Sequence, residues 1–599
     1  MIRDLSEPGV LEALGPDERA FDLVVVGTGP AAAVVVAELL RAGCAARIGV
    51  LESGRRRPWA FADRLRRCAS DGIRIKPHSR ERVLGGASTT WSGLSSPMDS
   101  IELRERPWLQ VSGWPLSPDE LDRGYAAAAE RYRFAAPGDF DPVAGGLADI
   151  RARGGLRPDW QAVEEKVFLA AEEAQDFGKE LAHVYDAPGV TLLLDASVKE
   201  LELEAAPASG GGDPSAAARV AAARVRTSTG AELRVTGARF LVATGGIENA
   251  RLLLNSPVPD GLAVPGLDPD GGALGRYMMN HPKNYHGVLH LAEPTRSLPY
   301  FFGCISRGFA GYGGLRLPDD AQERHGLVNA YVRFEPLFPW SDNRGVEALV
   351  HLVKRSRFLL TFWKRTKKDQ VIELRDYAET GDDSELDEEQ LSYLGLVLRV
   401  LKHLPSVAAY TKSRLLDRGG PLVQRVRVRN FLEMEPRRDH RVVLDDARDE
   451  HGYRLPRVIH DVAARDRESL ERLHAALVPE LERVGFGRLE TALRPGASPA
   501  PWPIDQDASH HIGTTRMGDD PTTSVVDTDH RVHGTTNLHV SGASVFPTSG
   551  CANPTYTIVA LAVLLAERLG PLVEADATGA AGPDGMTAPG SAHAPEARP

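Results

Sequence analysis

Two glycines near the N-terminus have the spacing of a phosphate-binding loop. Gly27 and Gly29 stand between an apolar run at 24–26 and a helical pattern at 31–40. The first glycine permits a tight turn, and the second lets the backbone approach a pyrophosphate. The N-terminus of the helix attracts that anion through its unpaired N–H groups and its dipole. The spacing therefore predicts a dinucleotide-binding loop.

Three neighbouring residues support this prediction. Ala32 occupies the third glycine position and is small enough for close helix–strand packing, while Pro30 falls in the first helical turn, where its missing N–H costs little. Glu52 ends the next apolar strand, at 47–51, where a carboxylate can bind ribose hydroxyls. Because two negative charges repel, Glu52 argues against a 2′-phosphate. The loop alone does not distinguish FAD from a nicotinamide dinucleotide.

The elements that must position this loop alternate between strand and helix. The run at 24–26, the helix at 31–40 and the strand at 47–51 form one βαβ half-unit. Further strands are predicted at 190–194 and 238–246. Other expected elements are a helix at 247–256, a strand pair at 441–461, a helix at 467–484 and a mostly helical region at 343–416.

Length and composition narrow the class of protein. The chain has 599 residues, which is too long for one simple core. Its net charge of −11 argues against nucleic acid as a partner. The four cysteines form no CxxC pair, so neither a metal site nor a disulfide framework is predicted. The N-terminal segment lacks the apolar core of a signal peptide and no stretch reaches transmembrane length, so a cytoplasmic location is expected.

Further motifs follow the first loop in a fixed order. They are RVLGGASTTWSGLSSPMD at 82–99, SGWPLSPDEL at 112–121, ATGGIENARLLL at 243–254, GRYMMNHP at 275–282, and a C-terminal block from HHIGTT to CANPT at 510–555. Together with the first loop, these motifs resemble the glucose–methanol–choline (GMC) oxidoreductase family. The resemblance extends across nearly the whole chain.

The resemblance implies an α/β fold. A Rossmann-like FAD-binding domain of the GMC/p-hydroxybenzoate hydroxylase type would carry an α+β substrate domain built on an antiparallel sheet. The expected pieces are FAD-binding segments at 15–100, 186–290 and 501–574, substrate-domain segments at 101–185 and 291–500, and a disordered tail at 575–599.

The resemblance, with the loop, also implies which residues bind FAD. Thr90 stands where some relatives carry a histidine that is covalently linked to FAD, so non-covalent FAD is expected. Val198 matches a position whose backbone meets the adenine. The other expected cofactor-binding residues are Gly27, Gly29, Pro30, Ala31, Glu52, Arg82, Gly85, Gly86, Ser88, Trp91, Ser92, Gly93, Ala243, Thr244, Gly245, Asn249, Gly542, Ala543, Pro554 and Thr555.

The C-terminal block implies a catalytic pair. The family's H-x-x-G-T histidine takes a proton from the substrate hydroxyl, and the spacing before Gly513 selects His510 rather than His511. An imidazole suits this role because its pKa lies near neutrality. Asn553 is expected to orient the substrate oxygen, since an amide does not titrate. Among the other histidines, His281 is the one expected to approach the cofactor.

The expected reaction is oxidation of an alcohol to a carbonyl, by an oxidase or a dehydrogenase. The histidine–asparagine pair and the SGWP segment resemble the sugar-oxidising, pyranose oxidase-like branch of the family, and this resemblance implies a sugar, glycoside or polyol as substrate. Oxygen, a quinone or another acceptor would take the electrons.

Several alternatives stay open at this stage. The substrate could be a choline-like, aliphatic or sterol alcohol, and for choline Phe334, Phe338 and Trp340 are candidate aromatic contacts. A non-oxidative member, such as a lyase, is a further possibility. The basic and apolar stretch FLLTFWKRTKK, at 358–368, could serve as a lid, a membrane-surface helix, a partner-binding element or an ordinary amphipathic helix.

Overall fold

The computed structural model describes most of the chain. The described residues are 1–75, 79–145, 158–171, 173–207, 217–296, 298, 300–301, 304–306, 308–338, 340–341, 343–356, 392–416, 422–504 and 509–579.

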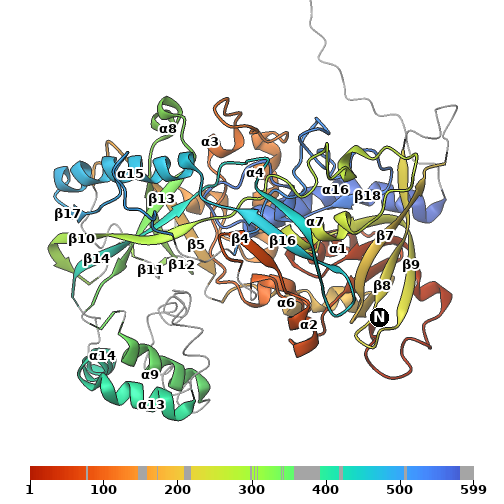
Figure 1. Ribbon diagram of the computed structural model, residues 1–599, viewed down its shortest axis with the longest axis horizontal. Helices are drawn as coiled ribbons and strands as arrows, with labels where there is room; N and C mark the ends of the chain where they lie inside the picture. The colour runs from red at the N-terminus through yellow and green to blue at the C-terminus, as the bar shows by residue number, and fades with distance from the viewer. Residues whose placement is uncertain are drawn as a thin grey trace, which may run out of the picture.

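A largely parallel sheet forms one half of the molecule, at the right of Figure 1. Its parallel strands are, in order, β1 (Ile2–Asp4), β6 (Val190–Leu194), β3 (Ile48–Glu52), β2 (Ala20–Val26) and β9 (Glu232–Val242). The sheet continues antiparallel into β8 (Ala218–Arg226) and β7 (Ser197–Ala205), and β18 (Leu538–Val540) pairs in parallel with the end of β9. This arrangement confirms the predicted α/β class.

The first helix of this half is buried on almost every side. α1 (Pro30–Arg41) begins directly after Gly29, as predicted, and all its residues from Ala31 to Leu39 are buried. α16 (Thr555–Thr578) packs against α1 and also against α4 (Pro118–Tyr132). Because other elements cover α1 on nearly all faces, its sequence, VVVAELL, is apolar on nearly all faces and does not show a single apolar stripe.

An antiparallel sheet forms the other half, at the left of Figure 1. Its strands are, in order, β11 (Cys304–Ser306), β12 (Phe309–Arg316), β13 (Ala330–Pro336), β14 (Val423–Leu432), β10 (Lys283–Thr295) and β17 (Gly487–Glu490), with β5 (Glu164–Ala171) paired to β12. α15 (Ala464–Arg483) packs on it and shares its apolar core. The α+β part of the fold prediction is therefore confirmed.

A small third sheet joins distant parts of the sequence. β15 (Arg441–Arg448) and β16 (Arg454–His460) form the predicted strand pair, and β4 (Ala69–Gly72) adds to it in parallel. This sheet contacts α7 (Gly246–Leu254), and its residues Val442 and Val458 belong to the core of the parallel-sheet half. These strands lie within 291–500, a range that the sequence assigned to the substrate domain.

Three other predicted boundaries also differ from the sheets and helices observed. β1 lies before residue 15 yet pairs with β6, because the sheet has an additional edge strand that the sequence did not signal. β10 starts at Lys283, so the antiparallel sheet begins before residue 290. α16 continues to Thr578, past the predicted start of the tail at 575, and residues 580–599 lie outside the described part of the chain.

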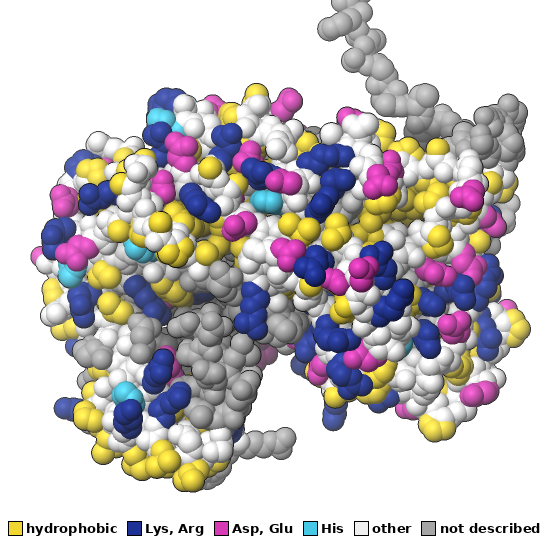
Figure 2. Space-filling model, in the orientation of Figure 1, with side chains coloured by type: hydrophobic (Ala, Val, Ile, Leu, Met, Phe, Trp, Pro, Cys, Tyr) yellow, Lys and Arg dark blue, Asp and Glu magenta, His cyan; other side chains and the backbone are white. Residues whose placement is uncertain are grey.

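A group of three helices projects from the antiparallel half, at the lower left of Figure 1. They are α9 (Arg344–Arg355), α13 (Tyr393–Lys402) and α14 (Leu404–Leu416). α13 leaves the side chains of Leu394, Leu398 and Leu401 more than half exposed, and apolar atoms gather at this edge in Figure 2. The stretch at 358–368 lies outside the described residues.

Short helices complete the chain. They are α2 (Ala60–Arg64), α3 (Ser100–Leu103), α6 (Phe177–Glu180) and α8 (Asp319–His325). Across the residues that the structure describes, no helix has both the length and the apolar character required to cross a membrane.

Candidate active site

A cavity of about 440 Å³ lies where the two halves meet. Both members of the expected pair, His510 and Asn553, line it, and so does Val198. The other predicted residues that line it are Gly27, Gly29, Pro30, Ala31, Glu52, Arg82, Gly86, Ser88, Trp91, Ser92, Ala243, Thr244, Gly245, Gly542, Ala543, Pro554 and Thr555. Residues from widely separated parts of the sequence therefore meet in one space.

The glycine loop presents bare backbone to this cavity. Gly27 has a φ of +104°, and a Cβ there would lie 2.5 Å from the carbonyl oxygen of Ala243, so the tight turn excludes a side chain. At Gly29, by contrast, an added Cβ would meet no atom within 4 Å, and the same holds for Gly245 and Gly542. The cavity thus has a cradle that side chains would fill, as the backbone contacts of a pyrophosphate require.

Glu52 lies at the end of β3 beside this cradle. Its carboxylate accepts hydrogen bonds from Thr28 Oγ1 at 2.6 Å and from the backbone N–H of Gly54 at 2.7 Å. Burial raises the pKa of Glu52, while these hydrogen bonds and the positive charge of Arg82 oppose the rise. Ser53 Oγ also donates to Glu52 Oε1, at 3.3 Å. A carboxylate has about four acceptor positions, so Glu52 retains capacity for a ribose hydroxyl. The residues present therefore fit a dinucleotide such as FAD.

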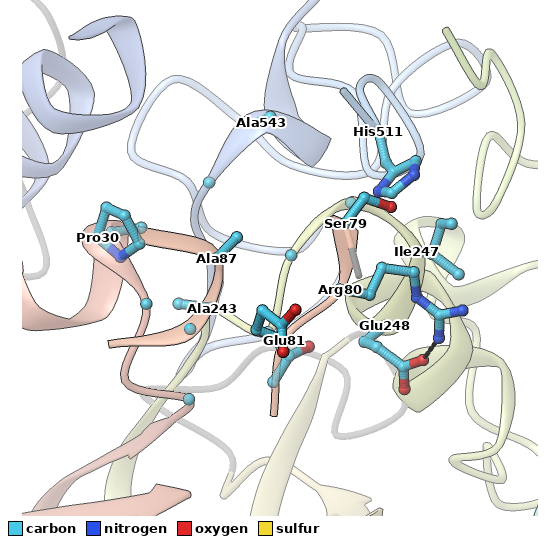
Figure 3. Close-up of a pocket in the computed structure, with 18 of the residues that line it drawn as sticks. Pro30, Ser79, Arg80, Glu81, Ala87, Ala243, Ile247, Glu248, His511 and Ala543 are labelled. Carbon is cyan, nitrogen blue, oxygen red and sulfur yellow. Dashed lines mark hydrogen bonds and ion pairs between the residues drawn. The ribbon is translucent and has the colours of Figure 1, made fainter. Parts of the chain in front are cut away.

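A cluster of charges lies on the opposite side of the cavity from Pro30 and Ala87 (Figure 3). Arg80 pairs with Glu248, and Arg82 Nη2 lies 2.7 Å from Glu248 Oε2. Burial alone would raise the pKa of Glu248, but the guanidinium groups of Arg82, Arg251 and Arg80 outweigh it and hold that pKa well below its usual range. The anionic carboxylate in turn fixes the arginines at the wall.

His510 is held by the chain segment that carries His281. The Nδ1 atoms of these two histidines are 2.8 Å apart. Asn280 Oδ1 accepts hydrogen bonds from the backbone N–H groups of His281 and His510, and Met279 and Ile512 form a backbone bridge beside them. His281 lines the cavity together with His510 and His511, the same cavity that holds the residues expected to bind FAD.

Asn553 stands just before α16, whose N-terminus reaches the cavity through Pro554 and Thr555. The loop before Asn553 is anchored to α3, since the backbone N–H of Cys551 donates to Glu102 Oε1 at 2.7 Å. Asn329 Nδ2 also donates to that oxygen, at 2.7 Å. Buried hydrogen bonds from distant segments therefore fix the position of Asn553.

Three predicted cofactor-binding residues do not line the cavity. Gly93 packs against the loop at Ala174, and Gly85 packs against α6, where an added Cβ at Gly85 would lie 2.6 Å from the nitrogen of Gly178. Asn249 is fully buried and joins three segments: it accepts from Thr244 N at 2.7 Å and donates to Ser541 O and Ser544 Oγ. Its amide supports the loops that reach the cavity rather than reaching it directly.

The sequence did not single out the residues that β10, β13 and β14 contribute. Lys283, Tyr331, Arg333, Arg429 and Phe431 line the cavity. The rings of Tyr331 and Phe431 stack with centroids 4.6 Å apart. The signal was a period of two along each strand, with Arg or aromatic residues on the face opposite the apolar core.

The aromatic residues proposed for choline lie elsewhere. Phe334 is buried in the core beneath the antiparallel sheet. Phe338 and Trp340 stack on each other with centroids 5.1 Å apart. None of the three is among the residues that line the cavity, so their arrangement does not support the choline alternative.

The C-terminal part of the chain, which contributes His510 and Asn553 to the cavity, matches a known protein family. Residues 436–562 match the family model described as GMC oxidoreductase. The matched segment includes His510 and Asn553, and this part of the chain is similar to the GMC oxidoreductases.

Individual relatives match shorter parts of the chain. A C-glycoside 3-oxidase of Arthrobacter globiformis is 35% identical over 23% of this chain and 26% of its own length. A paromamine 6'-oxidase of Streptomyces fradiae is 36% identical over 24% of this chain and 26% of its own length. A pyranose 2-oxidase of Tricholoma matsutake is 47% identical over 10% of this chain and 11% of its own length. The chain thus aligns with about a quarter or less of each of these relatives.

Two solved structures align along most of the chain, each at 15% identity. One is a pyridoxine 4-oxidase from "Mesorbium loti", with a TM-score of 0.46, covering 91% of this chain and 98% of the other. The second is a fungal aryl-alcohol oxidase, with a TM-score of 0.47, covering 92% of this chain and 99% of the other.

Proposed function

We propose that this protein is an FAD-dependent enzyme that oxidises an alcohol to a carbonyl, with a sugar, glycoside or polyol as substrate. The observation that carries the proposal is that a single cavity is lined by the glycine loop, Glu52, His510 and Asn553. A dinucleotide cradle and a pair of groups suited to a hydroxyl therefore share one space. The GMC family match at 436–562 supports the same class of reaction.

The residues of the chain have separate roles in this reaction. FAD, when bound, supplies the acceptor for the hydride. His510 takes the proton of the substrate hydroxyl, and the amide of Asn553 donates a hydrogen bond that holds the substrate oxygen. The N-terminus of α16, at Thr555, adds positive potential on the same side of the cavity.

FAD is proposed to bind without a covalent link. Thr90 lines the cavity at the position where some relatives carry the linking histidine, and a hydroxyl does not form that bond. Acid precipitation of the holoenzyme should release the flavin into solution. Flavin that stays on the precipitate would contradict this proposal.

The relatives support a carbohydrate-type substrate, since the names of three of them refer to a C-glycoside, paromamine and pyranose. The cavity wall adds a physical argument. Lys283, Arg333 and Arg429 line it, and Glu335 pairs with both arginines, at 2.6 and 3.3 Å. One carboxylate shared by two arginines leaves this wall cationic, which disfavours the quaternary ammonium of a choline-like alcohol. Oxygen or a quinone is the proposed electron acceptor. A reducing, cytoplasmic setting accords with Cys44, Cys68 and Cys551, which are free thiols.

The direct test is anaerobic bleaching of the flavin of the purified protein. Sugars, glycosides, polyols, choline and simple alcohols are added in turn, and the flavin absorbance is followed. Bleaching by members of the first three classes supports the proposal, and admission of air then separates an oxidase from a dehydrogenase. Bleaching by choline or simple alcohols alone would overturn the substrate class. A lyase would convert its substrate without bleaching.

A further inference from the structure

We propose that His281 is a positioning residue for His510: it holds the proton of the His510 imidazole on Nδ1, so that Nε2 is the nitrogen that receives the substrate proton. The inference rests on the proposed function of His510 as the base. It names a second residue of the same site and the way in which it acts.

The surroundings of His281 determine which of its nitrogens carries a proton. Its Nε2 faces the carbonyl oxygen of Ser549 at 3.3 Å, and a carbonyl oxygen only accepts hydrogen bonds. Nε2 therefore carries the proton. Burial lowers the pKa of His281 to about 4, although the carbonyl groups of Ser549 and Gly550 partly oppose the change, so the ring is neutral near pH 7. A neutral imidazole has one N–H, which leaves Nδ1 of His281 as an acceptor.

The consequence for His510 follows from the short contact between the rings. The two Nδ1 atoms are 2.8 Å apart, which is a hydrogen-bond distance. Because Nδ1 of His281 accepts, Nδ1 of His510 must donate. Neutral His510 then carries its single proton on Nδ1, and Nε2 on the other edge of the ring holds the lone pair. The opposite tautomer would place a lone pair of His281 against the Ser549 oxygen and protonate the atom needed as base.

The backbone keeps the two rings in this relation. Asn280 Oδ1 accepts from the N–H of His281 at 2.9 Å and from the N–H of His510 at 3.1 Å. Met279 and Ile512 exchange both backbone hydrogen bonds, at 2.9 and 3.1 Å. The ring planes lie 77° apart, with centroids separated by 4.9 Å. The contact therefore belongs to a fixed pairing of two segments rather than to one adjustable side chain.

The hydrogen bond also changes the basicity of His510. Protonated His510 is a stronger donor to His281 than neutral His510, so the contact favours the protonated form. Removing the acceptor should therefore make His510 less basic than it is in the wild type. It should also let part of the population hold its proton on Nε2, where His510 does not act as a base.

The first experiment compares His281→Leu, which removes the acceptor, with His281→Asn, whose Oδ1 takes the place of Nδ1. In anaerobic flavin reduction by an alcohol that bleaches the wild type, His281→Leu should be slower by about 3- to 10-fold, as expected for one lost hydrogen bond. The acidic limb of its pH profile should move to lower pH by about 0.5 to 1 unit. His281→Asn should restore both. A loss of rate with an unchanged acidic limb in both variants would overturn the inference.

The second experiment reads the tautomer directly and needs neither turnover nor a variant of His281. The holoenzyme is labelled with 15N-histidine, and the His510 signals are assigned by their loss in His510→Asn. Protonated Nδ1 and unprotonated Nε2 are expected for His510. A signal showing Nε2–H as the main form would refute the role of His281. If no alcohol bleaches the flavin, the proposed function fails, while this spectrum still decides the inference.

Discussion

The two walls of the cavity are built in opposite ways. The wall from the parallel sheet exposes backbone at Gly29, Gly245 and Gly542, where an added Cβ would meet no atom within 4 Å. The wall from the antiparallel sheet exposes large side chains, including Tyr331 and Arg333. Exposed backbone suits the phosphate groups of a dinucleotide, which are the same in every protein that binds it. Side chains, by contrast, can differ from one enzyme to the next and so fit one particular substrate. Changes to the first wall should therefore alter cofactor content, and changes to the second should alter substrate preference.

The largest effect is expected where the two walls meet, at His510. His510→Ala should keep FAD but slow flavin reduction by at least about 100-fold, as expected for the loss of a general base. Stopped-flow reduction measures the rate, and the flavin-to-protein absorbance ratio measures cofactor content. An unchanged rate would remove His510 from this role.

A substitution at Glu248 tests what holds the arginines in place at the wall from the parallel sheet, which we call the cofactor wall. Glu248→Gln leaves the buried Arg80 and the partly buried Arg82 without their carboxylate and should cost about 3 kcal/mol of unfolding free energy near pH 7. A folded-state pKa below the unfolded value adds stability above the unfolded pKa, and this stability is lost as pH falls. The difference between wild type and variant should thus begin to shrink as pH falls below about 4.3 in urea unfolding, and it should keep shrinking toward the much lower folded-state pKa. A gap that is independent of pH would contradict the ionic explanation.

Two glycine variants separate turn geometry from cradle space. Gly29→Val adds a side chain that meets no protein atom within 4 Å of its Cβ, so the protein should fold while its FAD affinity falls about tenfold or more. In Gly27→Val the Cβ would lie 2.5 Å from a carbonyl oxygen at a φ of +104°, so folding itself should suffer. Thermal unfolding and flavin titration distinguish the two. Equal loss of stability in both variants would contradict the separate roles expected for Gly27 in the turn and for Gly29 in the cradle.

The smallest effect is expected at the wall from the antiparallel sheet, which we call the substrate wall. Phe431→Leu removes the stacking with Tyr331, a contact worth about 1 kcal/mol, and should raise KM about fivefold while FAD content stays unchanged. Steady-state kinetics with the best alcohol of the panel and flavin absorbance test this. Loss of FAD in this variant would contradict the expectation that the substrate wall affects substrate preference and leaves cofactor content unchanged.

The cofactor wall was predictable because its signals are local. A strand, two glycines, a helix and a terminal acid lie within 20–52, and each has a direct physical meaning in that order. The substrate wall was not predictable to the same degree. Tyr331 and Phe431 lie opposite each other only because β13 and β14 pair antiparallel, and that pairing joins segments separated by the whole helical region.

The same limit explains two other differences. Gly85 and Asn249 belong to recognisable motifs, but motif membership does not tell whether a residue reaches the cavity or supports one that does. The contact between His281 and His510 depends on a bridge between segments at 279 and 512. The sequence marked both histidines, yet only the fold shows that their Nδ1 atoms meet.

The packing of α16 on α1 also bears on how the chain is made. α1 is buried from Ala31 to Leu39, and α16, which covers it, is formed by Thr555–Thr578. A ribosome synthesises residues 42–554 between the first helix and its cover. The apolar surface of α1 therefore stays open to chaperones and to aggregation while all of these residues are made, until α16 emerges and closes the core.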